Sequence, residues 1–113
     1  MSDLPDARCN KEAFKELTSA FPKVLVLITS DECPACAYAE MVVEDAEAEI
    51  GKEAATLEVK VGKNDPECDL LLKDLAVTAV PTGLFYESGV EKKRMGFSGN
   101  PQKDLQQVKE LVK

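Results

Sequence analysis

Two closely spaced cysteines that follow an apolar run constrain the fold of this chain more than any other feature. Residues 24–28 are all Val, Leu or Ile, and Cys33-Pro34-Ala35-Cys36 follows shortly after them. The apolar run predicts a strand buried on both faces, and the segment after the cysteines has helical periodicity. A strand that leads through C-x-x-C into a helix is the context in which two thiols form a redox pair. The motif therefore predicts thiol–disulfide exchange.

The position of each cysteine predicts its role. Cys33 comes at the strand–helix junction, where unpaired amides and the helix dipole favour the thiolate that attacks a disulfide. Cys36 comes one turn later and should be more buried, so we predict Cys33 as nucleophile and Cys36 as resolving thiol. Asp31 and Glu32 precede the nucleophile, and their charges either oppose thiolate formation or point into water with little effect.

Composition excludes several classes of partner. The 113 residues carry a net charge of −7, which argues against nucleic acid or an anionic membrane as a partner. No apolar run approaches the ~20 residues that span a bilayer, and residues 1–6 lack the basic and apolar regions of a signal peptide. We expect one domain over residues 1–113, monomeric and cytoplasmic.

The residue types present also limit the metal chemistry. The chain has no His and four Cys, so no Cys–His nucleophile can form. A structural zinc site commonly needs two C-x-x-C pairs, and the remaining Cys9 and Cys68 are far apart in sequence. We therefore expect no metal and no cofactor. A metal carrier that uses Cys33, Cys36 and an extra thiol stays open as an alternative.

Helical and strand patterns alternate along the whole chain. Asn10 is a candidate N-cap for a helix to about residue 21, and proline opens further helices over residues 34–50, 66–76 and 101–112. Strands are expected at 24–28, 56–61, 83–86 and 90–97, with a poor edge strand at 4–8. This order predicts an α/β fold, a mixed sheet with helices on both faces. The inner faces of the first two helices should carry Phe14, Leu17 and Phe21, and Tyr38, Met41, Val42, Ala46 and Ile50.

These features together resemble the thioredoxin family over nearly the full length. The resemblance rests on the strand that leads into Cys33-Pro34-Ala35-Cys36, on Val80-Pro81-Thr82, on the turn Ser88-Gly89 and on the closing amphipathic helix. It implies the thioredoxin fold, with a mixed sheet of four to five strands. It also implies that Pro81 is cis and faces the C-x-x-C, so that Val80, Pro81 and Thr82 bind an extended substrate strand.

Three departures from the family pattern are informative. Glu32 stands where thioredoxins carry Trp, and Pro34-Ala35 replaces Gly-Pro between the cysteines. Leu27 occupies the position where thioredoxins carry a buried Asp, a residue that assists proton transfer to the second thiol in that family. Proline directly after the first Cys is similar to glutaredoxin, although the glutathione-binding Gly-Gly and acidic pair are missing from residues 96–100.

Cys9 and Cys68 each come at a junction where a parallel strand would lead into a helix. In the thioredoxin arrangement the first and third strands are neighbours about 4.8 Å apart, which is compatible with the ~4.4–6.8 Å Cα separation of a disulfide. A second disulfide between Cys9 and Cys68, with a regulatory or stabilising role, therefore stays open as an alternative. Because cytosolic thiols stay reduced, two free thiols are the preferred expectation.

The function implied by the resemblance is that of a thiol–disulfide oxidoreductase that reduces protein disulfides. Its partners would be disulfide-containing protein substrates and, as electron donor, a reductase of the flavoenzyme type that serves this family. Three alternatives remain: a glutathione-coupled glutaredoxin-like enzyme, a redox-inactive binding module with this fold, and the metal carrier.

Overall fold

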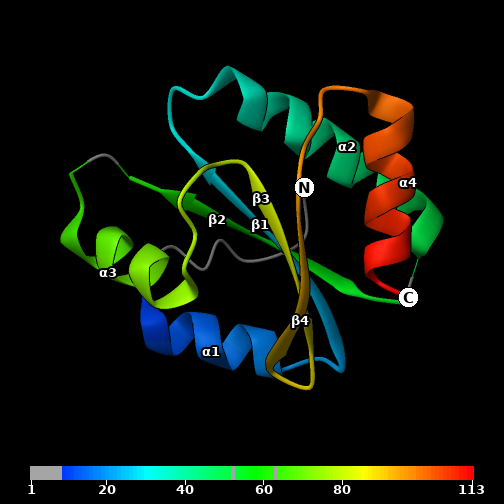
Figure 1. Cartoon of the computed structure of the whole chain (residues 1–113). Coiled ribbons are helices and arrows are strands. Elements are labelled where there is room, and N and C mark those ends of the chain that lie inside the picture. The colour runs from blue at the N-terminus through cyan, green and yellow to red at the C-terminus, as the bar shows by residue number, and fades with distance from the viewer. Residues whose placement is uncertain (1–8, 52, 63) are drawn as a thin grey trace.

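The computed structural model describes residues 9–51, 53–62 and 64–113, so the edge strand expected at 4–8 lies outside the described residues (Figure 1). Helices and strands follow one another in the predicted order. They are α1 (Lys11–Ser19), β1 (Lys23–Ser30), α2 (Pro34–Ile50), β2 (Ala55–Val61), α3 (Pro66–Leu75), β3 (Thr82–Glu87), β4 (Val90–Gly96) and α4 (Pro101–Leu111). No helix in the described part of the chain has the length and apolar character needed to cross a membrane.

Local capping signals explain where the helices begin. The Asn10 side chain accepts a hydrogen bond from the Ala13 N–H at 2.9 Å before α1, and Asn100 does the same for Lys103 at 3.1 Å before α4. Asp65 caps α3 by accepting from the Glu67 N–H at 3.0 Å. Proline occupies the first position of α2, α3 and α4, where its missing N–H costs no helical hydrogen bond.

The four described strands form one mixed sheet in the order β2-β1-β3-β4. β1 is parallel to β2, whereas β3 is antiparallel to both β1 and β4. In this register Ser30 at the end of β1 pairs with Val61, and Ile28 pairs with Thr82. The carboxyl ends of β1 and β2 therefore meet the amino end of β3 at one edge of the sheet.

Helices cover both faces of the sheet, as predicted (Figure 1). α1 and α3 pack with Val24, Val26 and Ile28 of β1, and α2 and α4 pack with Leu25 and Leu27. Residues 24–29 are buried throughout, which confirms β1 as a strand enclosed on both faces.

Two predictions about the inner faces of helices are wrong. Phe21 is 46% exposed because α1 ends at Ser19, so Phe21 no longer follows the helical face of Phe14. Met41 is 49% exposed, and Ala39 and Val43 lie in the core in its place. The inner stripe of α2 is thus rotated slightly from the one expected, toward positions with smaller side chains.

Candidate active site

Cys33 and Cys36 form a disulfide at the start of α2, with their Cα atoms 5.2 Å apart. Cys33 is the N-cap of the helix, and its Sγ accepts a hydrogen bond from the Cys36 N–H at 3.2 Å. Cys33 is half-buried, whereas Cys36 is only 1% exposed. Cys33 is therefore more accessible to a large substrate than Cys36. A thiolate on Cys33 would also have a backbone donor and the positive end of the helix dipole beside it.

Val80-Pro81-Thr82 lies at the same edge of the sheet. The Val80–Pro81 peptide bond is cis, as the family resemblance implied. Thr82 opens β3 opposite Ile28, and its hydroxyl donates to the Ala79 carbonyl at 2.6 Å. The register thus brings the cis-proline loop to the end of the strand that leads to Cys33.

A pocket of about 450 Å³ lies beside these elements. Its described wall is formed by the end of β1 with the loop that follows it, the corner between β2 and α3, the helix α3 itself, and the loop before β3. The described lining residues are Ser30, Asp31, Glu32, Val61, Gly62, Asn64, Asp69, Leu72, Val77, Thr78, Ala79 and Val80. The structure therefore brings together Asp31, Glu32 and Val80, three of the predicted site residues.

The other predicted residues of the motif lie outside that wall. Pro34 and Ala35 are exposed on the first turn of α2, next to the cysteine pair. Conversely, the sequence contained no signal that Asp69 or residues 77–79 belong to this site. These residues meet the Asp31–Glu32 loop only through strand pairing, which no local pattern encodes.

All charged residues in the described part of the pocket wall are acidic. Asp31, Glu32 and Asp69 are all exposed, and the described lining residues include no Lys or Arg. Glu32 adopts the left-handed backbone conformation with φ of 56°, which is uncommon for a residue with a side chain. This turn separates the end of β1 from Cys33.

Leu27 is 1% exposed in the core under α2, so the position of the family's buried Asp holds no ionisable group. Glu58 is the partner of Leu27 in β2, and it accepts a hydrogen bond from the buried Thr29 hydroxyl at 2.8 Å. Burial raises the pKa of Glu40 on α2, and the neighbouring Glu58 carboxylate raises it further. A pair of carboxyl groups, rather than one buried Asp, thus lies between α2 and the sheet.

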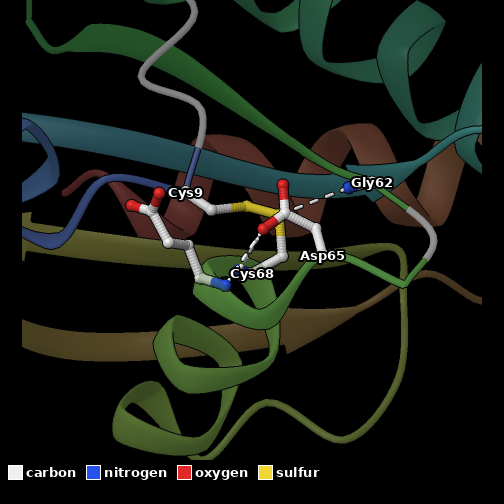
Figure 2. Close-up of a disulfide and its surroundings, with 5 residues drawn as sticks. Cys9, Gly62, Asp65 and Cys68 are labelled. Carbon is white, nitrogen blue, oxygen red and sulfur yellow. Dashed lines mark hydrogen bonds between the residues drawn. A yellow bond between two sulfur atoms is a disulfide. The ribbon is translucent and has the colours of Figure 1, made fainter.

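Cys9 and Cys68 form a second disulfide, with Cα atoms 4.7 Å apart (Figure 2). The preferred expectation of two free thiols is therefore wrong. That expectation rested on the compartment, whereas the fold brings the chain just before α1 within disulfide range of the first turn of α3. Both cysteines are buried, at 6% and 3% exposure, and the Cys68 Sγ accepts a hydrogen bond from the Gly62 N–H at 3.3 Å.

The second disulfide also bears on the metal-carrier alternative. Because Cys9 and Cys68 are bonded to each other, neither sulfur is available as the extra ligand that this alternative requires. Gly62 lines the pocket described above, so the bridge also holds part of the pocket wall.

Comparison with known proteins defines the fold. No family model matches this sequence, and no curated protein matches it. A thioredoxin mutant from Halobacterium salinarum superposes with a TM-score of 0.70 at 19% identity, covering 100% of this chain and 97% of that one. Mitochondrial thioredoxin 3 from Saccharomyces cerevisiae superposes with a TM-score of 0.71 at 16% identity, covering 93% of this chain and 92% of that one. Oxidised thioredoxin from Plasmodium falciparum superposes with a TM-score of 0.67 at 20% identity, covering 90% of this chain and 91% of that one. The chain has the thioredoxin fold.

Proposed function

We propose that the protein is a thiol–disulfide oxidoreductase that reduces protein disulfides through Cys33 and Cys36. One observation carries the proposal: a disulfide at the N-terminus of α2 whose first cysteine is accessible and whose second is buried. The cis-proline loop at the same sheet edge supports it, because Val80 offers backbone groups with which an extended substrate can pair.

The reaction transfers two electrons from the cysteine pair to the substrate. The Cys33 thiolate attacks one sulfur of the substrate disulfide, which forms a mixed disulfide and releases the other substrate sulfur as a thiolate. The Cys36 thiolate then attacks Cys33 Sγ, which forms the Cys33–Cys36 disulfide and releases the second substrate sulfur. The two protons of the original dithiol end on the two substrate thiols. A reductase that supplies two electrons would restore the dithiol.

In this proposal the protein works as a cytoplasmic monomer on disulfide-containing proteins. The reduced state is then the working state of the Cys33–Cys36 pair, maintained by the reductase. Val80, Pro81 and Thr82 bind the substrate backbone, while Asp31, Glu32, Pro34 and Ala35 form the surface around the nucleophile.

Insulin reduction in the presence of dithiothreitol tests the proposal. The wild-type protein should accelerate the reaction, and Cys33→Ser should reduce it to the uncatalysed rate. Cys36→Ser should instead accumulate a mixed disulfide on Cys33, detectable by mass spectrometry, because the second attack cannot occur. A Cys9→Ser/Cys68→Ser variant is the control and should keep its activity. Wild-type activity in Cys33→Ser would contradict the proposal, and an inactive wild type would favour a binding module.

A glutathione-coupled reaction is the second candidate, because Pro34 directly follows Cys33 as in glutaredoxins. A glutathione-coupled reaction predicts that glutathione alone sustains turnover. It also predicts that the Cys36→Ser variant accumulates a mixed disulfide between Cys33 and glutathione. Turnover that requires a dithiol donor would exclude it.

A further inference from the structure

We propose that the pocket beside Cys33 binds a basic side chain of the substrate polypeptide, so that the protein prefers disulfides flanked by Lys or Arg. This inference rests on the proposed function and specifies its substrate class. Its first support is size, since about 450 Å³ falls within the ~300–1,000 Å³ of typical ligand sites.

The chemistry of the wall matches the two parts of a basic side chain. Val61, Leu72 and Val77 supply apolar surface from β2, α3 and the loop before β3. The methylene stem of Lys or Arg packs on such surface while its charged end stays near water. An entirely aliphatic side chain would fill the same space without using the polar part of the wall.

Charge selects the basic side chain over other long ones. Asp31 and Glu32 approach the pocket from the β1–α2 loop, and Asp69 approaches it from α3. Among the residues that the structure describes, none forms an ion pair or a side-chain hydrogen bond with these three carboxylates. They are therefore available to a cation that a substrate brings, and a Glu side chain at the same place would be repelled.

The position of Val80 connects the pocket to the reacting disulfide. Val80 belongs both to the backbone edge proposed for substrate pairing and to the pocket wall. Side chains of an extended peptide alternate between two directions, so a residue close to the substrate cysteine would project toward the pocket. The basic residue is thus expected within about two positions of that cysteine.

The opposite wall is held in place before substrate arrives. Cys68 is bonded to Cys9, and its sulfur accepts the hydrogen bond from Gly62, a residue of the pocket wall (Figure 2). A wall that is already ordered loses little conformational entropy on binding, which favours discrimination between substrates.

Synthetic disulfide-linked peptides test the inference. Each carries one variable residue, Lys, norleucine or Glu, placed in turn at each of the two positions before and after the cysteine. At one position or more, the wild-type kcat/KM should be about tenfold higher for Lys than for Glu, with norleucine between them.

Matched variants separate the pocket from the overall charge. Asp31→Asn/Asp69→Asn removes two carboxylates from the wall. In this variant the ratio of kcat/KM for the Lys peptide to kcat/KM for the Glu peptide should fall to about twofold. Glu16→Gln/Asp45→Asn removes two exposed carboxylates, one on α1 and one on α2, that do not line the pocket, and the ratio should stay near tenfold. Asp31→Asn alone should give an intermediate ratio and replaces the double variant if the latter does not fold.

Two outcomes would overturn the inference and leave the proposed function in place. One is an equal kcat/KM for the Lys and Glu peptides at every position, and the other is an equal fall of the Lys-to-Glu ratio of kcat/KM in both double variants. The second would assign the preference to the net charge of −7 rather than to the pocket. If the wild type reduces none of the peptides, including norleucine, the proposed function itself fails, and the inference fails with it.

Discussion

Glu40 is a residue whose ionised form the fold disfavours. Burial raises its pKa, and the carboxylate of Glu58 raises it further, with partial opposition from Lys60. A raised folded-state pKa gives a stabilising contribution that is present below the unfolded pKa and is lost as the pH rises through the folded value. At pH 7 the wild-type protein is therefore less stable than it would be with a neutral side chain at this position.

Glu40→Gln should accordingly be more stable than the wild type at pH 7, and the difference should vanish near the ordinary Glu pKa of about 4. Urea denaturation at the two pH values measures this effect. Asp45→Asn on the exposed face of the same helix is the control and should change stability little at either pH. An equal effect of Glu40→Gln at both pH values would contradict the assignment.

At the scale of elements, Asp104 joins the start of α4 to α2. Its buried carboxylate accepts hydrogen bonds from the Tyr38 hydroxyl at 2.6 Å, from the Ser98 hydroxyl at 2.7 Å and from the Gly99 N–H at 3.1 Å. Burial by itself raises the pKa of Asp104, but these hydrogen bonds outweigh it and the pKa is lowered. Burial and the same carboxylate raise the pKa of Tyr38 to about 12.

Because the folded-state pKa is lowered, the contribution of Asp104 is present above the unfolded pKa and is lost as the pH falls through the folded value. Asp104→Asn should therefore cost roughly 1–3 kcal/mol at pH 7, and the deficit should shrink below about pH 4. Denaturant unfolding at both pH values gives the difference. In the same variant the Tyr38 pKa, followed by ultraviolet absorption, should move toward its ordinary value, and an unchanged Tyr38 titration would contradict the contact.

The Cys9–Cys68 disulfide is the second link between elements, and it closes a much longer stretch than the Cys33–Cys36 disulfide. The sequence separations are 59 and 3 residues. A cross-link that closes a longer loop removes more entropy from the unfolded chain. Cys9→Ser/Cys68→Ser should therefore lower the free energy of unfolding by roughly 2–5 kcal/mol. Cys33→Ser/Cys36→Ser is the matched control, and an equal or larger loss in it would contradict this assignment.

For the whole molecule, the two disulfides differ in their exposure to solvent. Cys33 is half-buried at the sheet edge, whereas Cys9 and Cys68 are enclosed between the sheet and the helices α1 and α3. A thiolate must reach a sulfur to exchange with it. Graded dithiothreitol followed by alkylation and peptide mass spectrometry should therefore open Cys33–Cys36 first, with the fold intact. Simultaneous opening of both disulfides would show that the buried bridge gains no protection from the fold.

Much of the architecture follows from local signals in the chain. The apolar β1 run, the asparagine and aspartate caps and the proline-led helices each act over a few residues, and together they predict the order of elements and the place of Cys33-Pro34-Ala35-Cys36. Phe21 and Met41 show the limit of such signals, because the end and the rotation of a helix depend on what packs against it.

The sequence alone therefore determined the redox motif, its helix and the layered fold, since these depend on residues close to one another along the chain. Only the tertiary structure decided that Cys9 pairs with Cys68 and that Asp31, Asp69 and Val80 surround one pocket. These contacts join residues far apart in sequence. Their physical basis is the register and order of the strands, which bring the ends of β1, β2 and β3 to one edge of the sheet.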